Sequence, residues 1–128
     1  MTISIACFAL LYAAFAVKHF LADFVFQLDW MVSGKDQTRG WAVALAAHAG
    51  CHAVLTLLLV LIVTPGLWWL APVDFVMHGG IDRAKGWALQ RLNLNQNDAG
   101  WWRVFGADQL LHHVIHLGFI VLIVEKGF

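Results

Sequence analysis

Four long apolar segments constrain the fold of this chain more than any other feature of its sequence. They cover residues 3–27, 41–63, 66–89 and 104–124. A helix rises 1.5 Å per residue, so about 20–25 residues are enough to cross a hydrocarbon core of roughly 30 Å. The connections are short, and strand patterns are absent. The sequence therefore predicts an all-α fold, an integral membrane antiparallel four-helix bundle made of one domain over residues 1–128.

Composition agrees with a location in the lipid bilayer. Apolar residues make up 61% of the chain and charged residues 12%, whereas soluble domains average about 45–50% and 25%. A chain this small has too little interior to hide that much apolar surface. Eight basic residues balance eight acidic ones, so no net field would attract nucleic acid. Cys7 and Cys51 lie outside any CxxC motif and are expected to act as small hydrophobic residues.

The distribution of basic residues predicts how the bundle is oriented. Lys35 and Arg39 lie in the first connection, Arg91 and Arg103 lie around the third, and the second, residues 64–66, has no basic residue. The positive-inside rule then places the first and third connections in the cytoplasm and both termini outside. The first segment lacks a basic start and a clean cleavage site, so we expect a retained membrane helix rather than a signal peptide.

Polar side chains recur at helical spacing in all four segments and would share one face of each helix. These stripes consist of His19, Asp23 and Gln27; His48 and His52; His78, Asp82 and Lys85; and Asp108, His112 and His116. All lie toward the predicted cytoplasmic ends, so antiparallel packing would bring them to one depth. One such pair alone would most simply be an interhelical hydrogen bond that holds the bundle. Four stripes at one depth favour a functional site.

Imidazole and carboxylate groups on facing helices are typical ligands of a divalent metal. Zinc fits these donors best, and iron or manganese is an alternative. The candidate metal ligands are His19, Asp23, His48, His52, His78, Asp82, Asp108 and His112. The candidate catalytic residues are Asp23, Asp108 and Lys85, and Gln27, Gln109 and His116 would orient the ligands or the substrate. Lys18 is expected to pair or to reach the interface rather than to act chemically.

The stripes also form a weak internal repeat. A His-xxx-Asp pattern occurs in the first and third segments, and a His-xxx-His pattern occurs in the second and fourth. Two pseudo-repeated hairpins related by an axis along the membrane normal would explain this pattern. Convergent packing around a shared site explains it equally well. Gly79, Gly80 and Gly86 are expected to allow close approach of helices.

The run from Lys18 to Gln27, followed by Asp29-Trp30-Met31, resembles the opening signature of a family of small bacterial and phage membrane proteins known only as a domain of unknown function. The later stretches His48-xxx-His52, His78-xxx-Asp82-xx-Lys85 and Asp108-Gln109-Leu110-Leu111-His112 also resemble its pattern. The resemblance implies a compact helical protein of the bacterial inner membrane, with no established activity. A looser similarity is to membrane-bound metal-dependent hydrolases, which also place His and Asp in short bundles.

The leading functional prediction is a membrane-embedded metal-dependent hydrolase that acts on an anionic lipid-linked or phosphorylated substrate. Arg83, Arg91 and Arg103 together with Lys85 would receive the anionic group. No specific hydrolase motif such as H-E-x-x-H is present in the sequence, and an oxygen-using diiron enzyme is an alternative. A second alternative is a metal-ion or proton transporter, which would need to be a homodimer. The remaining alternatives are a bis-histidine haem protein and a structural membrane protein with a buried polar network.

Overall fold

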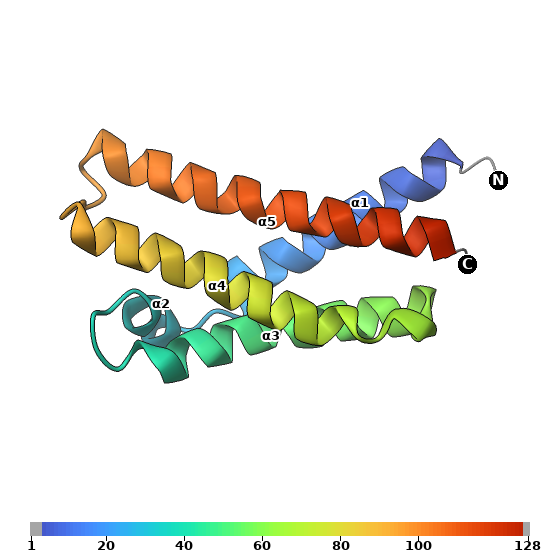
Figure 1. Ribbon diagram of the computed structural model, residues 1–128, viewed down its shortest axis with the longest axis horizontal. Coiled ribbons are helices and arrows are strands. Elements are labelled where there is room, and N and C mark those ends of the chain that lie inside the picture. The colour runs from blue at the N-terminus through green and yellow to red at the C-terminus, as the bar shows by residue number, and fades with distance from the viewer. Residues whose placement is uncertain (1–3, 127–128) are drawn as a thin grey trace.

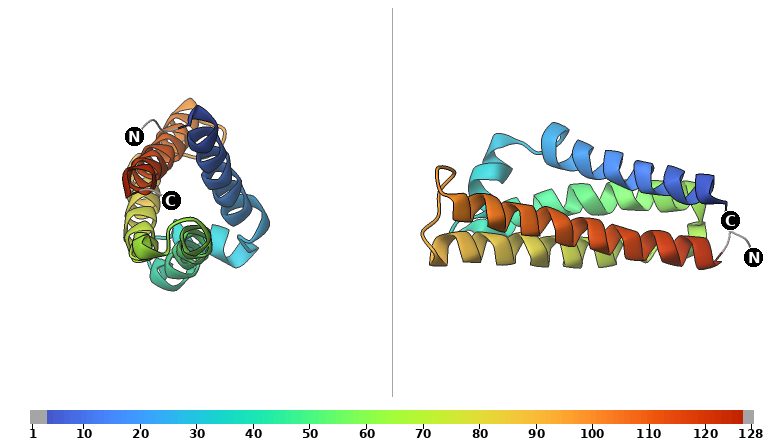
Figure 2. Two further views of the ribbon diagram at one scale, coloured as in Figure 1. Left: turned by 90° about the vertical axis from the view of Figure 1, so that its right-hand side faces the viewer. Right: turned by 90° about the horizontal axis from the view of Figure 1, so that it is seen from above.

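The computed structural model describes residues 4–126, and the regular structure within this range is entirely helical (Figure 1). The long helices are α1 (Ile5–Phe20), α3 (Trp41–Val63), α4 (Leu70–Arg91) and α5 (Ala99–Lys126), and α2 (Asp29–Lys35) is short. A π-helix, Leu21–Val25, continues α1, and a 3₁₀ turn, Pro65–Leu67, precedes α4. The long helices run lengthwise together, with the start of α1 and the end of α5 at the same end of the molecule (Figure 2).

Three of the helical stretches are long and apolar enough to cross a membrane. They are Ile5–Val25, which joins α1 to the π-helix, then α3 and α5. Helix α4 is not among them because it carries Asp74, Asp82, Arg83 and Lys85 within its length. The expectation of an all-helical chain is confirmed, and that of a fourth membrane span stays a prediction.

The first connection contains a short helix. Residues 29–40 were expected to connect the first two segments, and within them Asp29–Lys35 form α2. Asp29 lies in the first turn of this helix and Lys35 in the last, which suits the helix dipole. Gly34 lets α2 approach α3 closely, because a Cβ atom at this position would lie 2.7 Å from the Cβ of Ala44. This contact holds α2 against the bundle.

The other predicted segments differ from the observed helices at their ends. The second segment matches α3 from Trp41 to Val63. Helix α4 begins at Leu70 because the chain first makes the 3₁₀ turn, and α5 begins at Ala99, earlier than the predicted residue 104. A local turn precedes this start, and in it the Asp98 carboxylate accepts a hydrogen bond from the backbone of Asn95 at 2.8 Å.

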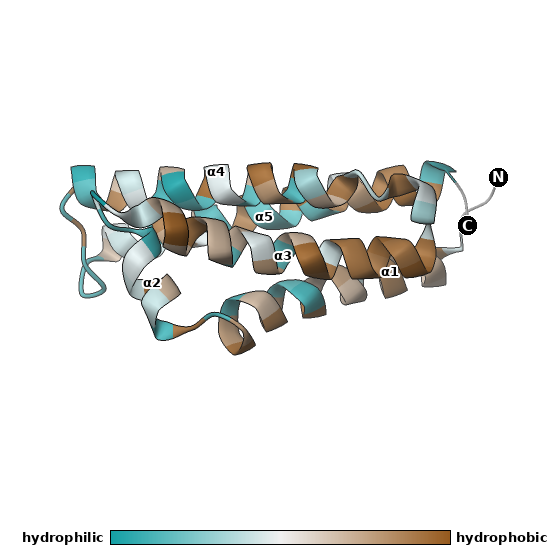
Figure 3. Cartoon of the chain, turned by 90° about the horizontal axis from the view of Figure 1, so that it is seen from below, coloured by the Kyte–Doolittle hydropathy of each residue, from teal (hydrophilic) through white to brown (hydrophobic). Residues whose placement is uncertain are grey.

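The interior of the bundle is apolar at one end and polar further along. The helices are coloured as mostly hydrophobic near the end that holds the start of α1 and the end of α5 (Figure 3), and buried side chains form an apolar cluster there. Its members are Leu11, Phe15, Val60, Leu67, Leu70, Phe119, Ile120, Ile123 and Val124. Because this cluster fills the interior there, the buried polar groups described next are closed off from that end of the molecule.

Candidate metal centre

Buried histidines, a buried carboxylate and the partly buried carboxylate of Asp23 converge from four helical elements in the polar part of the bundle. The π-helix supplies Asp23, α3 supplies His48 and His52, α4 supplies His78 and Asp82, and α5 supplies His112. We call these six residues the histidine cluster. Its histidines are at most 2% exposed. The helical spacing of the polar residues directs the side chains of each helix to the same interior face.

The carboxylate of Asp23 is bordered by three imidazoles. Its Oδ1 lies 2.9 Å from His52 Nε2 and 3.4 Å from His48 Nε2, and its Oδ2 lies 3.1 Å from His19 Nε2. Within residues 4–126, no lysine or arginine forms an ion pair with Asp23. Asp23 lies in the π-helix, and such a local change of helical geometry is frequent at functional sites.

The nitrogen atoms around Asp23 are spaced as ligands of one metal ion would be. His78 Nε2 lies 3.3 Å from His48 Nε2, and two ligands of a tetrahedral zinc ion with bonds of about 2.0–2.1 Å lie about 3.3 Å apart. Asp23, His48, His52 and His78 each offer a ligand atom within 4.8 Å of the others. His78 also forms a second such group with Asp82 and His112. The two groups therefore overlap at His78.

Asp82 differs from Asp23 because lysines neutralise it. Its Oδ2 lies 2.8 Å from Lys35 Nζ, and its Oδ1 lies 3.4 Å from Lys85 Nζ. Lys85 also lies 3.6 Å from Asp108. Lys35 was expected in a connection on the cytoplasmic side, and its side chain is only 6% exposed because α2 folds against the bundle. The sequence pattern did not reveal this role of Lys35.

His112 is oriented as metal-binding histidines commonly are. Its Nδ1 lies 2.8 Å from the backbone oxygen of Asp108, an arrangement that assigns the proton to Nδ1. The buried Nε2 has no hydrogen-bond partner and lies 3.9 Å from Asp82 Oδ1. The ring nitrogen that can bind a metal therefore faces the carboxylate of the second group.

A second polar cluster lies one helical turn closer to the apolar end. Lys18 Nζ lies 2.7 Å from Asp74 Oδ2 and 3.1 Å from His116 Nε2, and Thr56 donates a hydrogen bond to Asp74 Oδ2 at 2.6 Å. We call Lys18, Thr56, Asp74 and His116 the lysine cluster. All four residues are at most 4% exposed.

Sequence reasoning missed Asp74 and Thr56, although the signal was present. Asp74 lies four residues before His78, and Thr56 lies four residues after His52. The polar stripes of α3 and α4 therefore extend one turn further than the predicted site. His116 was expected to orient the metal ligands, but its Nε2 faces Lys18 at 3.1 Å and Asp74 at 3.7 Å. Lys18 was expected either to form an ion pair or to reach the interface, and it forms an ion pair with Asp74.

The remaining candidates take different places around the histidine cluster. His19 Nε2 lies 3.2 Å from the Gln109 side-chain oxygen, and Gln109 Nε2 lies 3.4 Å from Asp23. Gln27 donates to the backbone oxygen of Asp23 at 3.0 Å rather than to a candidate ligand side chain. Asp108 lies outside both metal-type groups, and its buried Oδ1 lacks a hydrogen-bond partner. The structure therefore brings the side chains of Gln109 and His19 to the histidine cluster, whereas Gln27 contacts only the backbone of Asp23.

Asp108 and Lys85 border a groove on the outside of the bundle, between α4 and α5. The groove has a volume of about 250 Å³, and its other walls are mostly apolar side chains such as Ile81, Val104 and Leu111. The groove therefore combines mostly apolar walls with the ion pair of Lys85 and Asp108.

A family model matches residues 11–127 of the chain, and its description reads "Protein of unknown function (DUF3307)". The chain belongs to this family. The predicted resemblance to a domain of unknown function is thereby confirmed, and the DUF3307 match includes every residue of both polar clusters. No curated protein and no solved structure matches the chain. The looser similarity to membrane-bound hydrolases stays a prediction.

Proposed function

We propose that this member of the DUF3307 family is a membrane-embedded metal-binding protein. The observation that carries the proposal is the environment of Asp23, a carboxylate bordered by three histidines that forms no ion pair with a lysine or arginine of the described part of the chain. Asp23, Asp82 and Asp108 supply three carboxylates, whereas Lys35 and Lys85 supply two ammonium groups. If the histidines are neutral, these three carboxylates and two ammonium groups together carry an excess of negative charge. A bound divalent cation would compensate this charge.

Zinc is the metal that best suits the donor set of the first group. Three imidazole nitrogens and one carboxylate oxygen come from Asp23, His48, His52 and His78. If three of these side chains bind the ion, the fourth tetrahedral position is left for a water molecule, as in catalytic zinc sites. Iron and manganese also accept imidazole and carboxylate ligands and are the alternatives.

A metal ion in this position would supply hydrolytic chemistry. When bound it would lower the pKa of a water molecule and so make water a nucleophile toward an ester; the hydrolysis would break the bond to the ester's leaving oxygen, which would depart as the protonated alcohol or phosphate. Asp108, with its unpartnered oxygen, would accept the proton of the water, and Lys85 would hold the negative charge of the substrate. The apolar groove beside these two residues supports a lipid-linked substrate. Asp23 acts in this scheme as a metal ligand.

The metal content and its dependence on the cluster test the binding proposal. Elemental analysis of the purified protein in detergent should find stoichiometric zinc, and His52→Ala should lose most of it. His113→Ala is the matched control, because this neighbouring histidine belongs to neither metal-type group. A metal-free wild-type protein that also fails to bind added zinc would favour the structural polar network. An absorbance band near that of haem or diiron centres would favour those alternatives.

Catalysis is tested separately from metal binding. We expect the zinc-loaded protein to release phosphate from vesicles that contain phosphatidate or a polyprenyl diphosphate, and Asp108→Asn to lose this activity while keeping its zinc. Zinc uptake into sealed proteoliposomes without hydrolysis would favour transport instead. The apolar cluster of Leu11, Phe15 and Ile120 fills the interior beyond the polar groups, which supports binding and catalysis over passage of an ion.

In the proposed membrane arrangement α4 is the fourth span of an antiparallel bundle. Both termini lie outside, and the histidine cluster opens toward the cytoplasm. Single cysteines in a chain without Cys7 and Cys51 test this orientation. A cysteine that replaces Ser33 or Asn95 should react only from the inner face, and one that replaces Gly66 only from the outer face. The reverse labelling would invert the topology and leave the metal proposal unaffected.

A further inference from the structure

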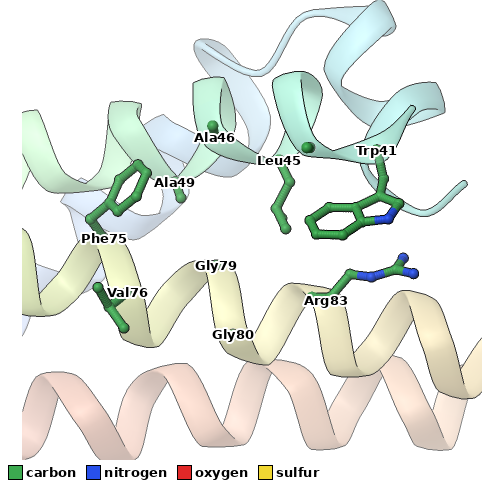
Figure 4. A pocket seen from close by; sticks show the side chains of 10 residues that line it. Trp41, Leu45, Ala46, Ala49, Phe75, Val76, Gly79, Gly80 and Arg83 are labelled. Atoms are coloured by element: carbon green, nitrogen blue, oxygen red, sulfur yellow. The ribbon is translucent and has the colours of Figure 1, made fainter. Parts of the chain in front are cut away.

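An apolar groove runs between α3 and α4, and none of the residues that line it belongs to the histidine cluster. Its volume is about 340 Å³. Trp41 and Arg83 lie at one end of the groove and Phe75 and Val76 at the other (Figure 4). Every side chain that lines the groove except Arg83 is uncharged.

The groove exists because side chains are missing along it. A Cβ atom at Gly80 would meet no atom within 4 Å, and one at Gly79 would meet only the Cβ of Ala49, at 3.7 Å. Gly86 shows the contrast, since a Cβ atom there would lie 3.2 Å from the Cα of Asp36. Gly86 thus serves close packing within the chain, as predicted, whereas Gly80 leaves open space.

Arg83 is a basic residue with no carboxylate partner among the described residues. Its guanidinium lies 4.4 Å from the centre of the Trp41 ring, and Nη1 donates to the backbone oxygen of Gln37 at 3.1 Å. By contrast, Lys18, Lys35 and Lys85 each pair with an aspartate. A guanidinium has five N–H donors in a planar fork that fits phosphate oxygens. Arg83 therefore retains both its charge and most of its donors for a ligand.

The order of groups along the groove matches the order of groups along a phospholipid. Trp41 is the first residue of α3, and tryptophan and arginine favour the membrane interface. From Arg83 to Val76 the helix advances seven residues, or about 10 Å at 1.5 Å per residue. This length of groove leads from the interface into the depth that acyl chains occupy.

We propose that this groove binds an anionic phospholipid of the leaflet next to α2, with its phosphate on Arg83 and an acyl chain over Gly79 and Gly80. A second copy of the chain fits the same face less well. Copies inserted in one orientation would be related by an axis along the membrane normal, which would bring both Arg83 side chains to one depth without a counter-charge. The lipid site does not involve the metal ligands.

Quenching of Trp41 fluorescence by lipids with brominated acyl chains tests the proposal. The Trp41 contribution is the difference between the wild-type protein and Trp41→Phe, measured in phosphatidylcholine vesicles with brominated phosphatidylglycerol or brominated phosphatidylcholine. We expect phosphatidylglycerol to bind about fivefold more tightly than phosphatidylcholine, the preference that one basic residue near the surface gives. Arg83→Gln should remove the preference for phosphatidylglycerol and leave the zinc content unchanged.

Filling the groove gives a second and independent readout. Gly80→Leu should reduce quenching by both lipids, because the new side chain enters open space and displaces the acyl chain. Gly106→Leu is the matched control, since a Cβ atom there also meets nothing within 4 Å. Equal affinity for the two lipids in the wild-type protein would overturn the proposal. So would cross-linked dimers that protect Trp41 from both brominated lipids, since they would place a second copy in the groove.

Discussion

The histidine cluster and the lysine cluster are built from the same kinds of residue, but their charges are arranged differently. In the lysine cluster Asp74 accepts from Lys18 at 2.7 Å and from Thr56 at 2.6 Å. In the histidine cluster Asp23 meets only imidazole and amide groups. The ammonium of Lys18 thus takes the place that a bound cation would fill, and within residues 4–126 no lysine or arginine forms an ion pair with Asp23.

This difference separates a polar group that stabilises the bundle from one that is arranged to bind. A buried ion pair whose hydrogen bonds are all made leaves no charge for a ligand to compensate. Removing one partner is costly because the charge of the other partner is then buried and unpaired. A buried carboxylate without a counter-ion is costly until a cation arrives. We therefore expect the lysine cluster to govern stability and the histidine cluster to govern metal affinity.

The largest effect is expected from Lys18→Met, which removes the cation of the lysine cluster. Asp74 would then be a buried carboxylate without a counter-ion, and stability should fall by about 3–5 kcal/mol. Unfolding of the metal-free protein in detergent, followed by helical circular dichroism, measures the loss. The double variant Lys18→Met with Asp74→Asn should recover most of it. Full stability of the single variant would contradict the assignment of Lys18 and Asp74 as a stabilising pair.

The second-largest effects are expected from neutralising Asp23 and Asp74, which should distinguish the roles of the two clusters. Asp23→Asn should weaken zinc binding by at least about 100-fold, or about 2.7 kcal/mol, because it removes the charge that balances the ion. The same change should not lower the stability of the metal-free protein, since no lysine loses its partner. Asp74→Asn should do the opposite, lowering stability while leaving the zinc affinity within a few-fold. Calorimetric titration with zinc measures the affinity of both variants, and thermal unfolding measures their stability. Equal losses of zinc affinity in the two variants would show that the two clusters act as one site.

Smaller effects are expected from the hydrogen bonds that support each carboxylate. Thr56→Val keeps the shape of the side chain and removes the bond to Asp74, so stability should fall by about 1.5 kcal/mol, a typical value for a bond to a charged group. Gln109→Leu removes the amide beside Asp23 and His19 and should weaken zinc binding by about tenfold, as loss of a group behind a metal ligand does. Zinc affinity that is unchanged in Gln109→Leu would remove Gln109 from the set of orienting residues.

The sequence by itself determined the four long helices, though not α2, and the face of each long helix that carries polar groups. Long apolar segments have few alternatives in a chain of this composition, and the i, i+4 spacing of His48 with His52 and of His78 with Asp82 fixes their shared faces. The same spacing extends to Thr56 and Asp74, so these residues were within reach of the pattern. The sequence also pointed to the family, through the run from Lys18 to Gln27.

Only the tertiary structure decided which carboxylate has a lysine beside it. Lys35 reaches Asp82 because α2 folds back onto the bundle, and Lys18 reaches Asp74 across the interior from a different helix. These pairings join residues 47 and 56 positions apart, and the periodicity of a single helix contains no information about its neighbours. The spacing of polar residues in the sequence likewise does not predict the π-helix that contains Asp23. The asymmetry between Asp23 and Asp74 therefore arises from packing between helices.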